Sequence, residues 1–195
     1  MRRRENKNSA FKEFISPILV LVIICFVVTF LLAFTYGITA PIIAENTAKA
    51  ASEARMELLP DADNFSDSGA DLVEYEAGKV FAEDCYTADN GAGMVVTVKS
   101  NSYGGLLTAM VGIDKDGKIT GVKVTEHADT PGVGTKAQDP GHLQQYVGLD
   151  SLASDTIKAH ADSVVEVTGA SVSSGAIHKA VYCALEQFKA MGGVK

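Results

Sequence analysis

An uncharged apolar stretch near the N-terminus limits what this chain can fold into more than any other feature. Residues 14–44 contain no Asp, Glu, Lys, Arg or His, and residues 17–36 are almost wholly apolar. A helix needs about 20 apolar residues to cross the hydrocarbon core of a bilayer, and an isolated span must satisfy its own backbone hydrogen bonds. The sequence therefore predicts a transmembrane helix over residues 14–44 and excludes a wholly soluble cytosolic enzyme.

The charges on either side of this stretch predict its orientation. Residues 1–13 hold five basic and two acidic residues, so the overall charge of −7 leaves −10 for residues 14–195. Basic residues favour the cytoplasmic side, which predicts a single-pass protein of the cell (inner) membrane with a cytoplasmic tail over residues 1–13 and an extracytoplasmic part over residues 45–195. The acidic charge and the absence of Trp argue against nucleic-acid binding. The apolar stretch makes the lipid bilayer an expected partner.

A cleaved secretory signal is the alternative interpretation of the same stretch. Residues 38–40, Ile-Thr-Ala, resemble a cleavage site only weakly. The apolar core of a signal peptide is usually about 7 to 15 residues long, which is shorter than this run. A retained anchor is therefore favoured.

The rest of the chain predicts an α+β domain. Residues 45–60 lack Gly and have no Pro before position 60, which favours a helical stalk that continues from the membrane. The acidic, polar composition of residues 61–71 is typical of an exposed linker. Alternating apolar and β-branched residues then predict strands over residues 72–75, 79–82, 93–100, 106–114 and 118–126, with a hairpin turn at residues 114–117.

Helical signals return in the last third of the chain. Residues 141–148 predict a short helix after Asp139-Pro140, residues 151–158 a turn or second short helix, and residues 163–167 a short β-like run. A helix over residues 173–191, ended by two glycines, is predicted by apolar residues at helical spacing, namely Ile177, Val181, Ala184, Leu185 and Phe188. The expected domain over residues 61–195 is an antiparallel sheet packed by helices.

Neither the cysteines nor the histidines predict a metal or catalytic site. Cys25 falls in the apolar run. We interpret Cys85 and Cys183 as two unlinked apolar side chains. A disulfide between them is the alternative, since the predicted extracytoplasmic compartment permits one. No metal-ligand spacing is found among the histidines, which are His127, His142, His160 and His178.

The segment Thr168-Gly169-Ala170-Ser171-Val172-Ser173-Ser174 precedes the last predicted helix. A helix N-terminus presents free amides and a favourable dipole to an anion. If Ser171 is the N-cap, its hydroxyl lies beside the backbone amides of Ser173 and Ser174. That hydroxyl is then either a plain helix cap or the carrier of a phosphate, and small residues before it allow close approach.

A second segment, residues 126–136, combines a turn with two glycines. The order Thr130-Pro131-Gly132-Val133 fits a type II turn. Gly132 and Gly134 would leave a backbone surface against which a flat ring can rest, although an ordinary loop is the alternative. Lys136 is a candidate contact for such a ring or for a phosphate, with a solvated loop lysine as the favoured interpretation.

Together the two segments, behind one N-terminal span, resemble the FMN-binding domain found in the G subunit of the Rnf complex, the ion-translocating ferredoxin:NAD oxidoreductase of bacterial membranes. The C subunit of the sodium-pumping NADH:quinone reductase shares this domain. The resemblance follows the order and proportions of nearly the whole chain, except residues 60–90. It implies a membrane-anchored electron-transfer subunit without a soluble substrate of its own, which works with other membrane and peripheral subunits of a translocase.

The resemblance also implies covalent FMN. In this family a phosphoester joins FMN to a hydroxyl in a Ser/Thr-Gly-Ala-Thr motif, added by a flavin transferase, and the acceptor here would be Ser171 in place of the usual Thr. Val165 stands where the family carries an acidic residue, with Glu166 alongside, and Asp129 replaces the family's Glu before the turn. The implied cofactor-binding residues are Thr130, Pro131, Gly132, Val133, Gly134, Lys136, Thr168, Gly169, Ala170, Val172, Ser173 and Ser174.

Two other functions stay open at this point. The chain could serve in the related sodium-pumping NADH:quinone reductase. It could instead be an anchored extracytoplasmic binding or assembly module without redox chemistry, in which Ser171 only caps a helix.

Overall fold

The computed structural model describes residues 15–157 and 164–193. Residues 1–50 and 51–195 form two compact units, which are described in turn. His160 falls outside the described residues, and so does residue 163, the first residue of the predicted β-like run.

The first unit is built on one long helix. Helix α2, Ser16–Leu58, continues without a break through Pro41, so the predicted anchor and the predicted stalk are a single helix. Its apolar side chains between residues 15 and 43 are exposed, as a helix surrounded by lipid requires. Thr35 and Thr39 bond their hydroxyls to carbonyls one turn earlier, at 2.8 and 3.0 Å, which satisfies polar groups inside the apolar helix. By length and composition, α2 is the one described helix able to cross a membrane.

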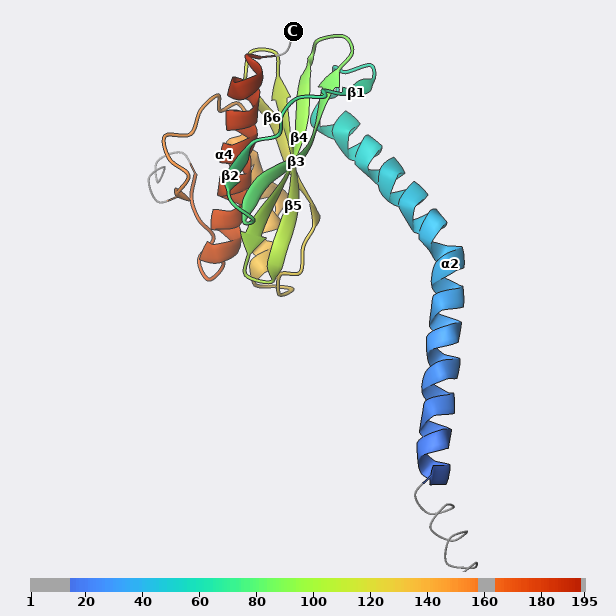
Figure 1. Cartoon of the computed structure of the whole chain (residues 1–195). Helices are drawn as coiled ribbons and strands as arrows, with labels where there is room; N and C mark the ends of the chain where they lie inside the picture. Colours follow the sequence, from blue (N-terminus) through green and yellow to red (C-terminus); the bar gives the residue numbers. More distant parts are fainter. Residues whose placement is uncertain (1–14, 158–163, 194–195) are drawn as a thin grey trace, which may run out of the picture. The chain divides into compact units, whose positions relative to one another are not determined.

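The second unit is built on an antiparallel sheet (Figure 1). The strand order is β1-β3-β4-β5-β6, and β2 also pairs with β3. Strands β4 to β6 confirm the predicted strands to within a few residues, because each carries a long apolar alternation. The bounds are β1 Phe65–Asp67, β2 Glu74–Glu76, β3 Val80–Ala88, β4 Gly93–Ser102, β5 Gly105–Asp114 and β6 Ile119–Glu126.

Three sequence predictions for the outer parts of this unit are wrong. The supposed linker over residues 61–71 contains strand β1, which pairs with β3 although its side chains are mostly exposed and show no apolar period. Strand β3 extends six residues further than predicted, to Ala88, because β4 pairs with it along that length. Residues 164–167 form no strand. Residues 151–156 form no helix, which leaves the turn that the sequence offered as the alternative.

The two faces of the sheet pack against two different helices. Successive residues of a strand point to opposite faces, and the neighbours Val95 and Val96 belong to separate apolar clusters. The smaller cluster holds Ala54 and Leu58 from the last turns of α2. Gly112 on β5 makes this packing possible, since a Cβ there would lie 2.8 Å from the carbonyl oxygen of Leu58.

Helix α4, Ser171–Met191, covers the opposite face (Figure 1). Its predicted apolar stripe is confirmed, since Ile177, Val181 and Leu185 are all at most 2% exposed and Phe188 packs against the same cluster. Gly192 ends the helix with a positive φ of 72°, the C-terminal signal that the sequence predicted. The helix begins two residues earlier than predicted, at Ser171.

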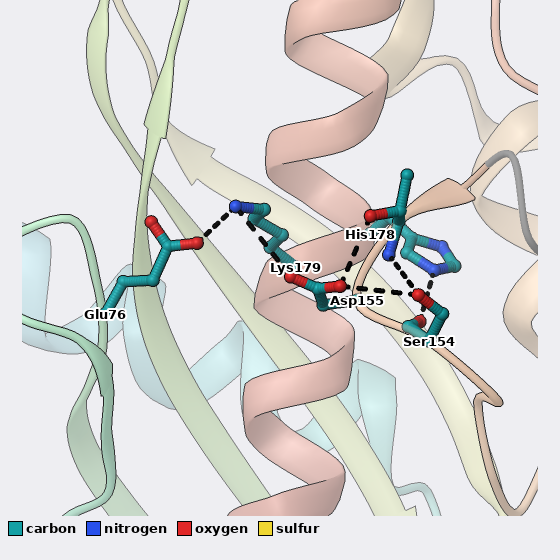
Figure 2. A network of polar contacts seen from close by, with 6 residues as sticks. Glu76, Ser154, Asp155, His178 and Lys179 are labelled. Carbon is teal, nitrogen blue, oxygen red and sulfur yellow. Dashed lines mark hydrogen bonds and ion pairs between the residues drawn. The ribbon is translucent and has the colours of Figure 1, made fainter.

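Short helices and a polar network complete the second unit. The predicted short helix is present as α3, Pro140–Leu143, followed by the turn η3, Gln144–Tyr146, while η2, Gly134–Gln138, was not predicted. Figure 2 shows Lys179 on α4 between Glu76 of β2 and Asp155, with which it forms ion pairs. His178 Nε2 lies 3.1 Å from the carbonyl oxygen of Ser154. These contacts hold residues 154–155 and strand β2 to α4.

Both cysteines of the domain are buried free thiols, as the favoured interpretation predicted. The Cys85 sulfur lies 3.8 Å from the Met94 sulfur and 3.7 Å from the Met191 sulfur. Burial raises the pKa of Cys85, and burial raises the pKa of Cys183 to about 11. Both side chains therefore stay neutral near pH 7 and act as small apolar groups.

Gln187 on α4 provides a test of how the segment before β2 is held. Its fully buried amide accepts a hydrogen bond from the Val73 amide at 2.7 Å and donates one to the Asp71 carbonyl at 3.1 Å. Gln187→Ala should lower the free energy of unfolding by about 1 to 3 kcal/mol, because a buried backbone amide loses its partner. Circular dichroism of the full chain in detergent during denaturation measures this. The neighbouring change Glu186→Ala is the control and should cost less than about 0.5 kcal/mol; equal effects would contradict the assignment.

Candidate functional site

A pocket of about 470 Å³ lies where the β4–β5 turn, the segment before η2 and the start of α4 meet. Ligand sites in proteins typically measure about 300 to 1,000 Å³. The two segments singled out by the sequence therefore share one cavity that is large enough for part of an organic cofactor. Its lining consists of Tyr103, Thr130, Val133, Gly134, Gly169, Ala170, Ser171, Val172 and Ser173.

Two tight turns of the same design form two walls of this pocket. In the first, the Val133 amide bonds the Thr130 carbonyl at 3.2 Å and Gly132 has φ of +74°. In the second, the Ala170 amide bonds the Val167 carbonyl at 2.9 Å and Gly169 has φ of +84°. A positive φ at the third position is what a type II turn requires and what glycine adopts at little cost. The first turn confirms the sequence prediction.

Ser171 is not the helix cap that the sequence suggested. The N-cap position is occupied by Ala170, whose carbonyl accepts the Ser174 amide at 2.8 Å, and no side chain caps the helix. Ser171 is the first residue inside α4, and its hydroxyl donates instead to the Glu166 carboxylate at 3.3 Å. Ser174 is committed elsewhere, since its hydroxyl accepts the Val167 amide at 3.1 Å. The exposed Ser171 hydroxyl thus carries out no structural task in the helix.

The start of α4 suits a bound anion. The amides of the first three helical residues, Ser171 to Ser173, have no carbonyl within the helix to bond, and the helix dipole favours negative charge at that end. Ser171 and Val172 are exposed beside the pocket, whereas Ser173 is 1% exposed. A phosphate held at Ser171 would therefore meet backbone donors and lie in the pocket mouth, which fits the donor set expected for FMN.

Asp129 links the three walls of the pocket. Its carboxylate, in a residue that is 4% exposed, accepts the Ser102 hydroxyl at 2.7 and 2.8 Å and the Gly104 amide at 2.9 Å. Burial by itself raises the pKa of Asp129, but hydrogen bonds from Ser102, from the Gly104 amide and from Ser173 outweigh it, so the pKa is lowered overall. The carboxylate is therefore ionised at neutral pH and joins the β4–β5 turn to α4.

Gly134 lines the pocket and also allows close packing beside it. A Cβ at this buried position would lie 2.8 Å from Asp129 Cβ and 2.9 Å from Ser173 Oγ. Its lack of a side chain therefore lets Asp129 approach Ser173 of α4. Gly132 has open space around it and does not line the pocket.

The predicted residues divide into two groups. Eight of them line the pocket together with Tyr103. The pocket lining does not include Pro131, Gly132, Lys136, Thr168 or Ser174. Sequence reasoning missed Tyr103, whose only signal is an aromatic residue in the Ser-Tyr-Gly-Gly sequence between two predicted strands.

Two of the described histidines, His142 and His178, are buried among structural neighbours. His178 is fully buried, with Nδ1 3.3 Å from the Tyr146 hydroxyl. His142 is 6% exposed, and its Nδ1 lies 3.0 Å from the side-chain amide nitrogen of Gln145. Burial lowers the pKa of His142. Among the residues that the structure describes, no group of three or more His, Cys, Asp or Glu side chains is placed to hold a metal ion.

The ionised Asp129 predicts a pH dependence of stability. Because its pKa is lower in the folded chain than in the unfolded one, its contribution is present above the unfolded value near 3.9 and is lost as the pH falls through the folded value. Asp129→Asn should remove part of the fall in unfolding free energy between about pH 5 and pH 3, and should cost about 1 to 3 kcal/mol at pH 7. Denaturant titrations at several pH values measure both effects. An unchanged slope would contradict the assignment, and the exposed Asp116→Asn is the control.

Comparison with known proteins agrees with this geometry. Residues 102–186 match the model of the FMN-binding domain, a range that includes Tyr103, Asp129 and Ser171. The chain is 29% identical over 180 residues to the G subunit of the proton-translocating ferredoxin:NAD(+) oxidoreductase complex of Clostridium ljungdahlii, covering 90% of this chain and 91% of that protein.

Two further relatives are also G subunits of such complexes. One is the G subunit of the ion-translocating oxidoreductase complex of Methanosarcina acetivorans, 29% identical over 149 residues, which are 75% of this chain and 79% of the relative. The other is the G subunit of the Na(+)-translocating ferredoxin:NAD(+) oxidoreductase complex of Acetobacterium woodii, 28% identical over 162 residues, or 75% and 78% of the two chains. The chain therefore carries an FMN-binding domain and is a relative of the G subunits of the ion-translocating oxidoreductase complexes.

Proposed function

We propose that this chain is a membrane-anchored electron-transfer subunit of an ion-translocating ferredoxin:NAD oxidoreductase (Rnf) complex, with FMN attached to Ser171 through a phosphoester. The observation that carries the proposal is the Ser171 hydroxyl, which lies in the pocket shared by the two predicted segments and does not cap its helix. The FMN-binding domain and the names of the relatives support the cofactor and the membership of a multi-subunit complex.

The residues around Ser171 fit the attached phosphate. An ester at the Ser171 oxygen leaves the phosphate with negative charge, and the first amides of α4 are positioned to stabilise it by about 0.3 to 1 kcal/mol at this exposed end. Val133, Val172 and Tyr103 offer apolar surface to the ring. When bound, FMN supplies the electron-transfer chemistry, and the protein supplies its position and electrostatic surroundings.

Glu166 prepares the acceptor hydroxyl before attachment. Its carboxylate accepts the Ser171 hydroxyl hydrogen, which orients the oxygen. When the Ser171 oxygen bonds to the flavin phosphate, the phosphoanhydride bond of an activated flavin donor breaks and releases a phosphate-bearing leaving group. Glu166 offers a base for the proton that Ser171 loses in this step. Glu166 stands five residues before the acceptor, and Val165 occupies the position where the family has its acid. Once the ester has formed the hydrogen is gone, so Glu166 acts on the attachment step by a flavin transferase rather than on the bound cofactor.

The expected topology places this domain outside the cytoplasm. The basic residues before α2 and the acidic remainder of the chain favour that orientation. A flavin released there would be lost by dilution, so a covalent bond suits a permanent electron carrier.

The two other functions make different predictions. The relatives of this chain belong to ferredoxin:NAD and ion-translocating oxidoreductase complexes, which favours that assignment over the quinone-reducing relative. A non-redox assembly module would carry no flavin on Ser171.

Attachment at Ser171 is tested by producing the full chain with its flavin transferase and inspecting the denatured band for flavin fluorescence. We expect a fluorescent band from the wild type and Ser171→Thr, and none from Ser171→Ala. The Ser171→Ala variant should keep its stability within about 0.5 kcal/mol, because no cap is lost. Ser151→Ala, at an exposed serine outside the pocket, is the control. A fluorescent Ser171→Ala band, or a dark wild-type band, contradicts the proposal.

The same assay, followed over time, tests Glu166. Glu166→Gln should slow attachment about tenfold, the rate equivalent of losing roughly 1.5 kcal/mol from a hydrogen bond to a charged group. Val165→Asp in the Glu166→Gln background should restore part of the rate by supplying the carboxylate from the neighbouring position. Equal rates for wild type and Glu166→Gln would remove Glu166 from the attachment step while leaving Ser171 as the acceptor.

Topology is tested by labelling intact cells. Asp116 is exposed in the β5–β6 turn, and Asp116→Cys should react with a membrane-impermeant maleimide without lysis. The parent chain, whose domain cysteines are buried, is the control. Labelling that requires lysis would place the domain in the cytoplasm.

A further inference from the structure

We propose that Tyr103 covers the flavin ring at the mouth of the pocket and that Asp129 is the positioning residue that holds it there. This inference rests on the proposed function, because it concerns the cofactor attached at Ser171. Neither the FMN-binding domain match nor the names of the relatives assign a role to either side chain.

Tyr103 lines the pocket from a third segment, separate from the two turns. It is in the β4–β5 turn, lines the pocket and is 76% exposed. Val133 from the first turn and Val172 from α4 line the same pocket and are 50% and 55% exposed. Single exposed apolar residues are ordinary, but three from separate segments around one cavity form an apolar rim, which marks a binding surface. A planar aromatic ligand is the partner that a tyrosine face and two valines suit.

The residues on both sides of Tyr103 donate hydrogen bonds to one carboxylate, that of Asp129. Ser102 donates its hydroxyl and Gly104 donates its amide to Asp129. Gly104 also rests directly on the loop, since a Cβ there would lie 2.1 Å from the Ala128 carbonyl oxygen. The turn therefore has little freedom to move away from the pocket, and Tyr103 is the residue between its two bonded neighbours.

The same carboxylate fixes the other walls. Asp129 directly precedes the turn that carries Val133, and Gly134 lets it approach Ser173 on α4, two residues after Ser171. The position of Tyr103 relative to Ser171 is thus set through one buried group. Because the backbone is already ordered, a ring that binds between Tyr103 and α4 loses little conformational entropy in arranging its site. Covering the ring also excludes water from one of its faces.

Iodide quenching of flavin fluorescence tests this in the full-length flavinylated protein in detergent, with mass spectrometry of the Ser171 peptide to measure how much flavin each variant carries. Tyr103→Ala should raise the iodide quenching constant per attached flavin toward that of free FMN. Tyr103→Phe should stay near the wild type, because the aromatic face is retained. Leu106→Ala is the matched control, since Leu106 is exposed on the next strand and does not line the pocket.

Asp129 is tested by the same readout. Asp129→Asn should raise the quenching constant in the same direction as Tyr103→Ala, and Asp129→Glu should return it toward the wild type by restoring a charge. Because Asp129→Asn also weakens the fold, Ser102→Ala serves as a milder variant that removes one of the two bonds beside Tyr103, and it should give an intermediate value.

The outcomes separate this inference from the proposed function. If the peptide carries flavin and Tyr103→Ala leaves the quenching constant unchanged, the role of Tyr103 is overturned while attachment at Ser171 stands. A rise with Tyr103→Ala but none with Asp129→Asn or Ser102→Ala overturns the role of Asp129. If the wild-type peptide carries no flavin, the proposed function and this inference both fail.

Discussion

Three segments far apart in the sequence meet at one buried carboxylate, that of Asp129, and the pocket exists because they do. An ionised group removed from water needs hydrogen bonds to offset the cost of burial. Ser102 and the Gly104 amide from the β4–β5 turn supply them, and Ser173 of α4 lies close enough to help lower the pKa of Asp129. The need to satisfy this charge holds the turn, the loop and the helix in one arrangement, which makes Asp129 a structural requirement of the site rather than a reacting group.

The position of the helix follows from the packing of the sheet. Strands β3 to β5 present one apolar face to α4 and the other to the last turns of α2. The buried stripe of α4 fixes its rotation, so that Ser173 and Ser174 are buried while Ser171 and Val172 are exposed beside the pocket. The proposed attachment residue at the first helical position therefore combines an exposed hydroxyl with backbone amides that still need partners.

Under the proposed attachment of FMN, the charges near Ser171 suit two successive states of the same oxygen. Before attachment, Glu166 accepts the hydroxyl hydrogen and directs the oxygen. After attachment, the phosphate gains from the helix amides and dipole, while the carboxylate no longer has a hydrogen to accept. Both groups are near the surface, so water screens the repulsion between them. The arrangement favours forming the bond without strongly disfavouring its product.

Local patterns in the sequence determined the parts of this protein whose cause is itself local. The uncharged run predicted helix α2, apolar alternation predicted β4 to β6, and Pro131-Gly132 predicted a turn whose hydrogen bond joins Thr130 to Val133. The stripe from Ile177 to Leu185 predicted α4 because helical period and burial coincide there.

Only the tertiary structure decided the features that depend on contacts between distant residues. Strand β1 has no apolar period of its own and exists through its pairing with β3. Ser171 lies inside α4 rather than at its cap because the Ala170 carbonyl bonds the Ser174 amide, and packing of the helix decides that register. Tyr103 lies in the site because its two neighbours, Ser102 and Gly104, donate hydrogen bonds to Asp129, which is 27 and 25 positions further along the chain. The hydrogen-bond donors of a carboxylate are those that lie close to it in space. Asp129 meets its donors only when the sheet, the loop and the helix have packed together.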